Sequence, residues 1–195
     1  MNRLISAVAV TLVTLVTLAG MAPSKARADE ATHANGGLGF HNEAAPVGVR
    51  WWLSGQKVGI DLGLGFTSVP AARYPDEKVT GWSIDAGIPL VLKSWDRVHV
   101  LFRPGLLYHS QQETATASTG PPVAFDTENA TTFSVSGEIE AEVFLVDNCS
   151  ISASHGIEFD SFNPAGPGKS VTTFETIGNN FTRVGFHVYL FGGNK

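Results

Sequence analysis

Alternation between apolar and polar side chains is the dominant pattern of this chain, and its clearest stretch runs from 133 to 145. Successive side chains of a β-strand point to opposite faces, so strict alternation predicts a strand with one apolar and one polar face. The odd positions carry Phe133, Val135, Gly137, Ile139, Ala141, Val143 and Leu145, and the even positions from 134 to 142 carry Ser134, Ser136, Glu138, Glu140 and Glu142. This segment therefore predicts a long strand with three carboxylates on its polar face.

Seven further segments alternate in the same way and are separated by residues that favour turns. Several of them are longer than the usual strand of about five or six residues in a soluble sheet. Helical periodicity is nearly absent after the N-terminal region. The sequence therefore predicts an all-β fold whose eight strands cover 38–40, 47–53, 58–67, 82–92, 98–109, 133–145, 151–160 and 183–191.

The connections between these strands alternate in length. The links at 54–57, 93–97 and 147–149 are short, and those at 70–79, 113–129 and 162–180 are long; the first link, 42–46, is brief but falls on the long-loop side. Short turns at one end and longer loops at the other are typical of outer-membrane barrels. The pattern therefore predicts an antiparallel up-and-down arrangement with both chain ends on the short-turn side.

Two folds use such strands in opposite ways. In a soluble sandwich the apolar face forms the core, whereas in a transmembrane barrel it faces lipid and the polar face lines the interior. Here the polar face is rich in glycine, which suits the narrow interior of an eight-stranded barrel, and its charges of both signs can pair when buried. We therefore predict an eight-stranded antiparallel transmembrane β-barrel, with a soluble sandwich as the alternative.

The polar face predicts a charge network inside this barrel. A four-residue turn at 54–57 sets Leu53 opposite Val58, and this register places Arg50 opposite Asp61. The three glutamates of 133–145 stand about 7 Å apart and need cations nearby, for which Arg103 and Arg183 are the candidates. The predicted network comprises Arg50, Asp61, Asp85, Arg103, Glu138, Glu140, Glu142 and Arg183.

The N-terminal region predicts export. A short basic start, an apolar run over 4–18 and the small-x-small sequence Ala26-Arg27-Ala28 indicate a secretory signal peptide at 1–28, leaving a single domain at 29–195. The alternative, an uncleaved anchor, is disfavoured because the run is shorter than the roughly 20 residues that a spanning helix needs. Loss of 1–28 removes three basic residues and no acidic ones, so the acidic mature chain does not attract nucleic acid by charge. Cys149 has no partner in the chain for a disulfide.

The end of the chain carries a motif of its own: the segment 183–191 has a glycine at 185, alternating apolar residues, Tyr189 and a final aromatic, Phe191. With this ending, the chain resembles the small eight-stranded outer-membrane proteins of the OmpX, OmpW and OmpA-transmembrane-domain kind over 35–191. The resemblance implies that Gly185, Tyr189 and Phe191 belong to an insertion signal for the barrel assembly machinery. It also implies a location in the bacterial outer membrane, in contact with its lipid and lipopolysaccharide. Candidates for aromatic girdles at the membrane surface are Trp51, Trp52, Trp82, Trp95, Tyr108, Tyr189 and Phe191.

Catalysis is not predicted, although some small barrels of this class are lipid deacylases. The segment 151–160 offers Ser152, Ser154, His155, Glu158 and Asp160, and a triad needs its base within hydrogen-bond reach of the nucleophile. Alternation places His155 on the opposite face from Ser154 and Glu158, so these residues do not suit a triad. His99, His109 and His187 share the inner face but are interpreted as polar lining, and His33 and His41 carry no ligand spacing. We therefore expect no enzymatic activity, no metal and no cofactor.

Three functions remain open. The favoured one is an outer-membrane barrel with a narrow, charge-paired lumen, acting structurally or through its external loops in adhesion, small-solute passage or envelope integrity. The second is a lipid-modifying barrel enzyme of the deacylase type. The third is a secreted soluble β-barrel that binds an apolar ligand. No ligand motif is present in the long connections, so the sequence does not identify a partner for the loops.

Overall fold

The computed structural model describes residues 34–53, 55–71, 74–114, 127–166, 168–176 and 183–192. The predicted signal peptide, 1–28, and His33 lie outside them. Within these ranges every regular element is a strand, and no helix is long and apolar enough to cross a membrane. The strands are β1 (Gly36–Phe40), β2 (Val47–Trp52), β3 (Gly59–Ala71), β4 (Tyr74–Gly87), β5 (Leu90–Ser94), β6 (Val98–Thr114), β7 (Thr127–Val146), β8 (Cys149–Asn163), β9 (Val171–Thr176) and β10 (Arg183–Phe191).

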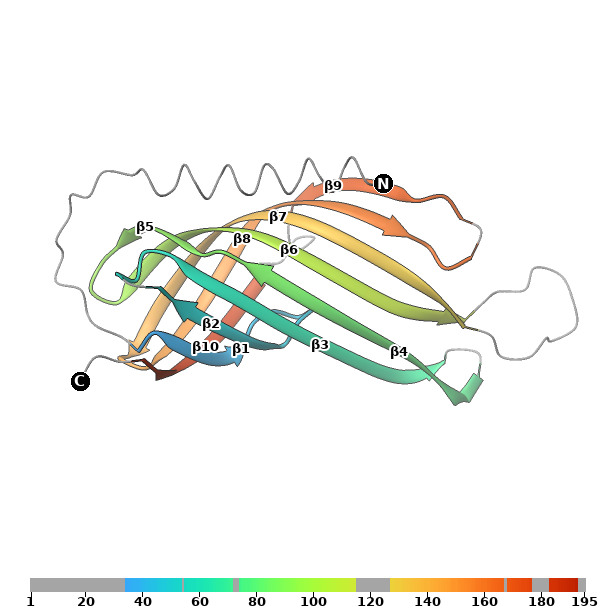
Figure 1. Cartoon of the computed structure of the whole chain (residues 1–195), viewed down its shortest axis with the longest axis horizontal. Helices are drawn as coiled ribbons and strands as arrows, with labels where there is room; N and C mark the ends of the chain where they lie inside the picture. The colour runs from blue at the N-terminus through green and yellow to red at the C-terminus, as the bar shows by residue number, and fades with distance from the viewer. Residues whose placement is uncertain are drawn as a thin grey trace, which may run out of the picture. The chain divides into compact units, whose positions relative to one another are not determined.

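The strands close into a barrel (Figure 1). All pairings are antiparallel, and the ring runs β1, β2, β3, β4, β6, β7, β8 and β10, with β10 returning to pair β1. Three tight connections, between β2 and β3, β5 and β6, and β7 and β8, lie at one end, which we call the short-turn end. The predicted all-β class and eight-stranded antiparallel barrel are confirmed.

Two strands lie outside the predicted set of eight. The predicted strand 82–92 is divided into β4 and β5, because the chain leaves the ladder at Ile88 and Pro89. Proline has no amide hydrogen to donate to a ladder, and β5 resumes pairing with β6 after this break. In the predicted loop 162–180, β9 pairs the outer part of β8 and extends the sheet above β10.

The polar stretch at 70–79 was predicted as a loop, and this prediction is wrong. Strands β3 and β4 continue through it, pairing as far as Pro70 with Lys78 and Ala71 with Tyr74. Strands β6 and β7 likewise run on to Thr114 and back from Thr127. These extensions carry no regular apolar alternation, which explains why the sequence pattern did not reveal them.

The barrel has an apolar outside and a polar inside. Outward side chains such as Leu62, Phe66 and Ile139 are exposed by 53, 75 and 53%, whereas the residues that alternate with them are buried or half-buried. Arg50, Asp61 and Glu142, for example, are at most 1% exposed. The apolar face is therefore not the core of a soluble sandwich, and the charged face forms the interior.

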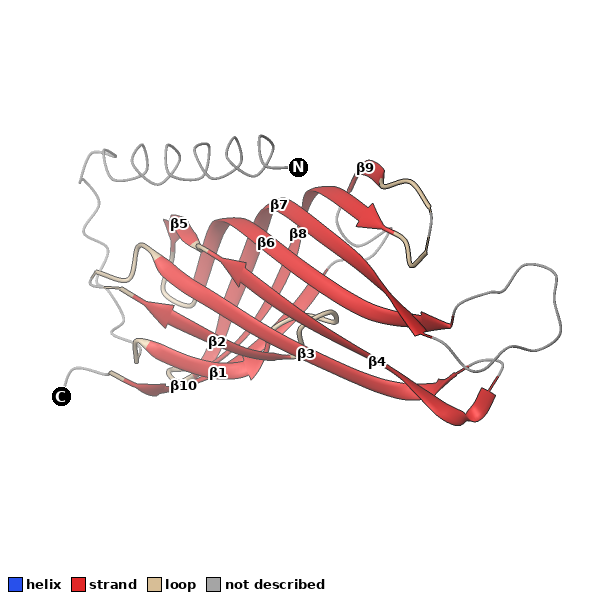
Figure 2. Cartoon of the chain, turned by 45° about the vertical axis from the view of Figure 1, so that its right-hand side comes forward, coloured by secondary structure: helices blue, strands red, loops and turns tan. Residues whose placement is uncertain are grey.

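The wall of the barrel has two parts of different height (Figure 2). Near the short-turn end all eight strands are paired on both sides; we call this part the closed ring. Beyond Leu64, β3 pairs only β4, and β9 pairs only β8, so the sheet β3-β4-β6-β7-β8-β9 continues with two free edges. We call this continuation the upper wall. The hairpin of β1 and β2 stops short because these strands have only five and six residues.

Candidate functional site

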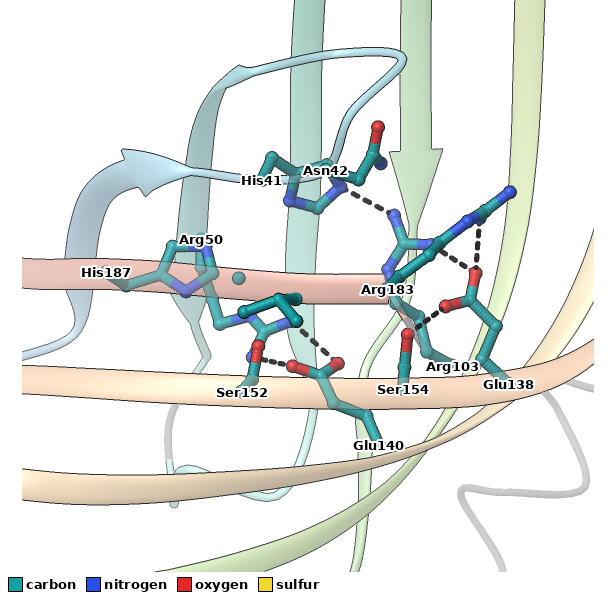
Figure 3. Close-up of a pocket in the computed structure, with 12 residues that line it drawn as sticks. His41, Asn42, Arg50, Arg103, Glu138, Glu140, Ser152, Ser154, Arg183 and His187 are labelled. Atoms are coloured by element: carbon teal, nitrogen blue, oxygen red, sulfur yellow. Dashed lines mark hydrogen bonds and ion pairs between the residues drawn. The ribbon is translucent and has the colours of Figure 1, made fainter. Parts of the chain in front are cut away.

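The charged side chains of the barrel interior form one connected network, and it contains all eight residues that were predicted for it. They come from β2, β3, β4, β6, β7 and β10. Figure 3 shows five of them inside the barrel: Arg50, Arg103, Glu138, Glu140 and Arg183. Seven of them are at most 3% exposed, and the side chain of Arg183 is 18% exposed. Buried charges are stable only when they are paired and hydrogen-bonded. The contacts of each arginine therefore determine whether the buried carboxylates have partners.

Arg50 of β2 is the centre of the network. It lies opposite Asp61 of β3, as the register of the 54–57 turn predicted, and donates from Nε and Nη2 to both carboxylate oxygens at 2.8 Å. Across the barrel it donates to Glu140 of β7 from Nη1 and Nη2 at 2.8 and 2.9 Å. Its Nη1 lies 3.4 Å from Oε2 of Glu142. One guanidinium thus ties β2 and β3 to the opposite wall through two bidentate pairs, the strongest arginine geometry.

Arg103 of β6 forms the second centre. It donates from Nε to Asp61 at 2.9 Å and from Nη1 to Glu138 at 3.1 Å, and its Nη2 contacts Asp85. Asp61 therefore accepts from two arginines, which joins the two centres. Arg183 of β10 adds a third cation by donating to Glu138 at 3.0 Å and to Glu158 at 2.7 Å.

The predicted partners of the three glutamates are partly wrong. Arg103 and Arg183 were the expected partners of all three, but of these glutamates they pair only with Glu138. Glu140 and Glu142 lie nearer the short-turn end and face Arg50 instead. Arg103 pairs with Glu138 because the two lie directly opposite each other on β6 and β7. Arg50 meets Glu140 and Glu142 across the barrel, a contact that depends on closure and on the tilt of the strands.

An apolar cluster closes the short-turn end of the interior. It consists of Trp52, Leu101, Phe144 and Tyr189, each at most 2% exposed. The hydroxyl of Tyr189 donates to Oε1 of Glu142 at 2.6 Å and accepts from the indole of Trp52 at 3.2 Å, so the cluster supplies one of the hydrogen bonds to this glutamate. Trp52 and Tyr189 were proposed as surface girdle residues, and that assignment is wrong because both side chains point inside.

The connection between β1 and β2, residues 41–46, folds into the other end of the closed ring, which no sequence pattern had indicated. His41 Nε2 lies 2.9 Å from Asp85 Oδ1 and 2.9 Å from Arg103 Nη2, so the loop joins the charge network. Ala45 is fully buried, and the hydroxyl of Ser83 donates to the carbonyl of Ala44. Figure 3 shows His41 and Asn42 above the arginines.

Glycines on the inner face make room for this loop. A Cβ atom on Gly63 would lie 2.8 Å from the His41 ring and 2.9 Å from the Ala45 methyl. Both distances are shorter than real Cβ contacts, so a larger residue there displaces the loop. The inward glycines were predicted because an eight-stranded barrel is narrow. At Gly63 the missing side chain makes room for the 41–46 loop in particular.

Little space is left in the interior. The cavity between the loop and the network measures about 20 Å³ and is lined by residues such as Arg50, Glu138, Ser152 and His187. That volume holds about one water molecule. The apolar cluster below, the ion pairs at mid-height and the loop above leave no open pore through the closed ring.

The residues considered for catalysis do not assemble into a triad. Ser154 points inside and donates to Glu138 at 2.7 Å, whereas His155, its neighbour, is exposed on the outer face. The two side chains therefore lie on opposite sides of the wall, as alternation predicted. Ser152 is buried on the inner face, and Glu158 accepts from Arg183.

The histidines of the inner face, considered as possible metal ligands, do not form a cluster among the described residues. His99 and His187 are buried inside, and His109 lies further up β6, where its ring approaches Gln111 at 3.4 Å. In the ranges that the structure covers, one group of three potential ligands lies close together: Glu158, Asp160 and Glu175.

The residues of the terminal motif occupy different environments. Gly185 faces inward against Ser152, Tyr189 is buried in the apolar cluster, and Phe191 is 48% exposed at the end of β10. Cys149 begins β8 as a free thiol.

Comparisons with protein-family models, curated proteins and solved structures gave no match. The function is therefore inferred from the geometry. The arrangement is a barrel whose interior is filled by ion pairs and whose exterior is apolar.

Proposed function

We propose that this protein is an integral barrel of the bacterial outer membrane that acts structurally, in envelope integrity or as a scaffold for its long connections. The observation that carries this proposal is the inverted distribution of side chains. Leucine, isoleucine, valine and phenylalanine side chains lie outside around the wall, and arginines and carboxylates lie inside. In water this arrangement is unfavourable, because apolar surface remains hydrated while charges lose their solvent. In a bilayer the same apolar surface meets hydrocarbon chains, and the closed ring leaves no backbone group unpaired at its edges.

The filled interior argues against two of the other functions. Solute passage requires a continuous opening, whereas the ring contains a cavity for about one water. A soluble carrier of apolar ligands requires an apolar cavity, whereas the lining here consists mainly of charged and polar groups. A deacylase has no support from the positions of Ser154 and His155, which lie on opposite faces.

Two features of the sequence support export and insertion. The segment 1–28 has the composition of a signal peptide. The segment 183–191 alternates and ends on an aromatic residue, like the segment that the barrel assembly machinery recognises in the small outer-membrane proteins that this chain resembles. On this proposal the partners of the folded chain are outer-membrane lipid and lipopolysaccharide. The upper wall and its long connections then face the cell exterior.

The proposal is tested by expressing the full chain with its native N-terminus and fractionating the cells. We expect the protein in the outer-membrane fraction, with a gel mobility that changes on boiling because a folded barrel resists detergent until heated. Purified protein in planar bilayers is expected to show no stable conductance. A soluble periplasmic product without a mobility change contradicts the membrane location, and a steady ion current contradicts the closed interior.

A further inference from the structure

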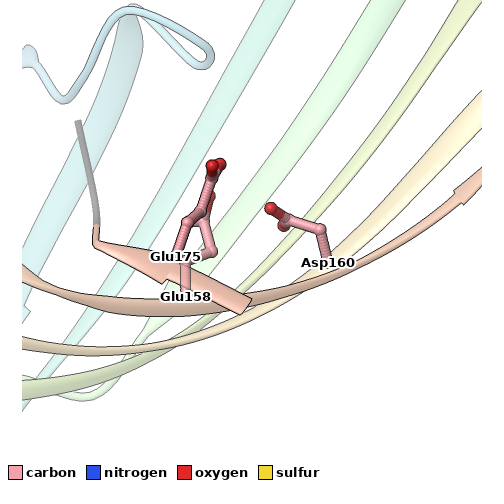
Figure 4. A group of neighbouring side chains, drawn as sticks. All are labelled: Glu158, Asp160 and Glu175. Carbon is pink, nitrogen blue, oxygen red and sulfur yellow. The ribbon is translucent and has the colours of Figure 1, made fainter. Parts of the chain in front are cut away.

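Strand β9 brings a third acidic residue to two carboxylates of β8. Glu175 of β9 lies directly opposite Glu158 of β8, and Asp160 follows two residues further along the same face of β8. Figure 4 shows the three side chains projecting from the two strands on the same side of the sheet. Like charges directly opposite each other destabilise a strand pair. A cation bound at this position would therefore strengthen the pairing of β8 with β9.

Basic side chains compensate only part of this charge. Glu158 accepts from Arg183 at 2.7 Å, but Arg183 also serves Glu138. Asp160 and Glu175 form no ion pair with any residue that the structure describes. Asp160 is 9% exposed, and its Oδ1 is buried with no hydrogen-bond partner in the described part of the chain. A buried carboxylate oxygen without a donor is costly, and it points to a ligand that supplies positive charge.

We propose that Glu158, Asp160 and Glu175 bind a calcium ion between β8 and β9. One oxygen from each side chain lies within 4.8 Å of the other two. Calcium binds oxygen at 2.3–2.6 Å, so two oxygens on one ion are separated by up to about 5 Å, and the observed spacing fits. Glu175 is exposed, which leaves one side open for the water molecules that complete the coordination shell.

The ion would fasten the free edge of the upper wall. Strand β9 has six residues, all exposed, and pairs only with β8. Backbone hydrogen bonds to a single neighbour leave such a strand easily opened. Calcium shared by Glu175 on β9 and by Glu158 and Asp160 on β8 adds a cross-link at this edge. The site depends on the pairing of β8 with β9 and not on the membrane location, so it stands or falls separately from the proposed function.

The test is calorimetric titration of the folded full-length mature chain in detergent with calcium chloride. We expect one site with a dissociation constant of about 0.1–1 mM, in the range of partly exposed extracellular sites. Glu175→Gln is expected to weaken binding at least about 10-fold by removing one of three charged ligands. The control is Glu113→Gln, which changes an exposed glutamate that lies opposite Glu128 in β6 and β7. Among the residues that the structure describes, these two form no group of three potential ligands. This control is expected to leave binding unchanged.

Hydrogen exchange of the Val171–Thr176 amides provides a second readout that needs no variant. Calcium is expected to slow their exchange severalfold without changing that of the closed ring. The proposal is overturned if the wild-type protein takes up no calcium at millimolar concentration. It is equally overturned if Glu175→Gln and Glu113→Gln bind alike, or if calcium leaves the exchange of β9 unaffected.

Discussion

The closed ring and the upper wall are built from the same long strands, yet their inner faces differ. In the ring each strand has two neighbours, and on the inner face Arg50 and Arg103 form ion pairs of 2.8–3.1 Å with Asp61, Glu140 and Glu138. In the upper wall the sheet has two free edges, and exposed residues such as Glu113 and Glu175 form no ion pair with any residue described.

The difference shows that charges on the inner face need ion-pair partners where the barrel is closed. Where eight strands close, water is excluded and each charge must find a partner inside. Where the sheet stays open, water solvates exposed charges such as Glu113, so these charges need no ion-pair partner. Stability is therefore concentrated in the ring, and the upper wall is free to vary. The following substitutions test this contrast, from the largest expected effect to the smallest.

The largest effect is expected from Arg50→Met. This change leaves Asp61, Glu140 and Glu142 buried without their shared cation, and removal of one partner from a buried ion pair costs about 3–5 kcal/mol. Arg183→Met, at the upper limit of the ring with its side chain 18% exposed, is expected to cost less, about 1–3 kcal/mol, because Glu138 keeps Arg103 as a partner. Urea unfolding of the refolded barrel in detergent measures both. Equal losses would show that the two positions share one environment.

The outer face is tested by placing arginine at two heights on β3. Leu62→Arg introduces a charge on the outside of the ring and is expected to cost about 2–4 kcal/mol in a bilayer. Ser68→Arg makes the same change on the outer face of the upper wall and is expected to cost at most about 1 kcal/mol, because it lies about 20 Å further along the strand, near the membrane surface. Unfolding in lipid vesicles provides both values. Similar costs at the two heights would contradict a bilayer centred on the ring.

The inserted loop is tested at Gly63. Gly63→Val places a side chain where His41 and Ala45 now lie, and overpacking of this kind costs about 1–3 kcal/mol. Gly137→Ala is the control, because its new methyl would meet only the Phe102 ring at 3.6 Å, an ordinary contact. Thermal loss of the unboiled gel form compares the two variants. If Gly63→Val were as stable as Gly137→Ala, the position of the 41–46 loop inside the ring would not contribute to the stability of the barrel.

The smallest effect separates two adjacent residues of β8. Ser154→Ala removes a hydroxyl that donates to buried Glu138, and the loss of such a bond to a charged group costs about 1.5–3 kcal/mol before compensation by the two arginines. With that compensation we expect about 1 kcal/mol. His155→Ala, on the exposed outer face, is expected to change stability by less than about 0.5 kcal/mol. The enzymatic alternative would be supported if the wild-type protein hydrolysed a lipid substrate and both variants lost this activity.

The features that could be predicted from the sequence are those set by neighbouring residues in a strand or by two strands joined by a short turn. Alternation assigned each side chain to a face, and the turn at 54–57 placed Arg50 opposite Asp61. It did not identify Glu140 as a partner of Arg50, because these residues are 90 positions apart and meet only when the barrel closes. The inward path of 41–46 was also missed. Its polar residues, alanines and proline are those of an ordinary surface loop, and the space beside Gly63 that it fills exists only in the closed ring.

The central claim, that the apolar face contacts lipid while the polar face is enclosed, is tested most directly at Trp51 and Trp52. These neighbours point to opposite sides of β2, with exposures of 43 and 2%. Two single-tryptophan variants, with the other three tryptophans changed to phenylalanine, would be folded into vesicles whose acyl chains carry bromine, a short-range quencher of tryptophan fluorescence. The account predicts strong quenching of Trp51 and little quenching of Trp52. Equal quenching of both, or protection of Trp51 in protein that is bound to the vesicles, would contradict it.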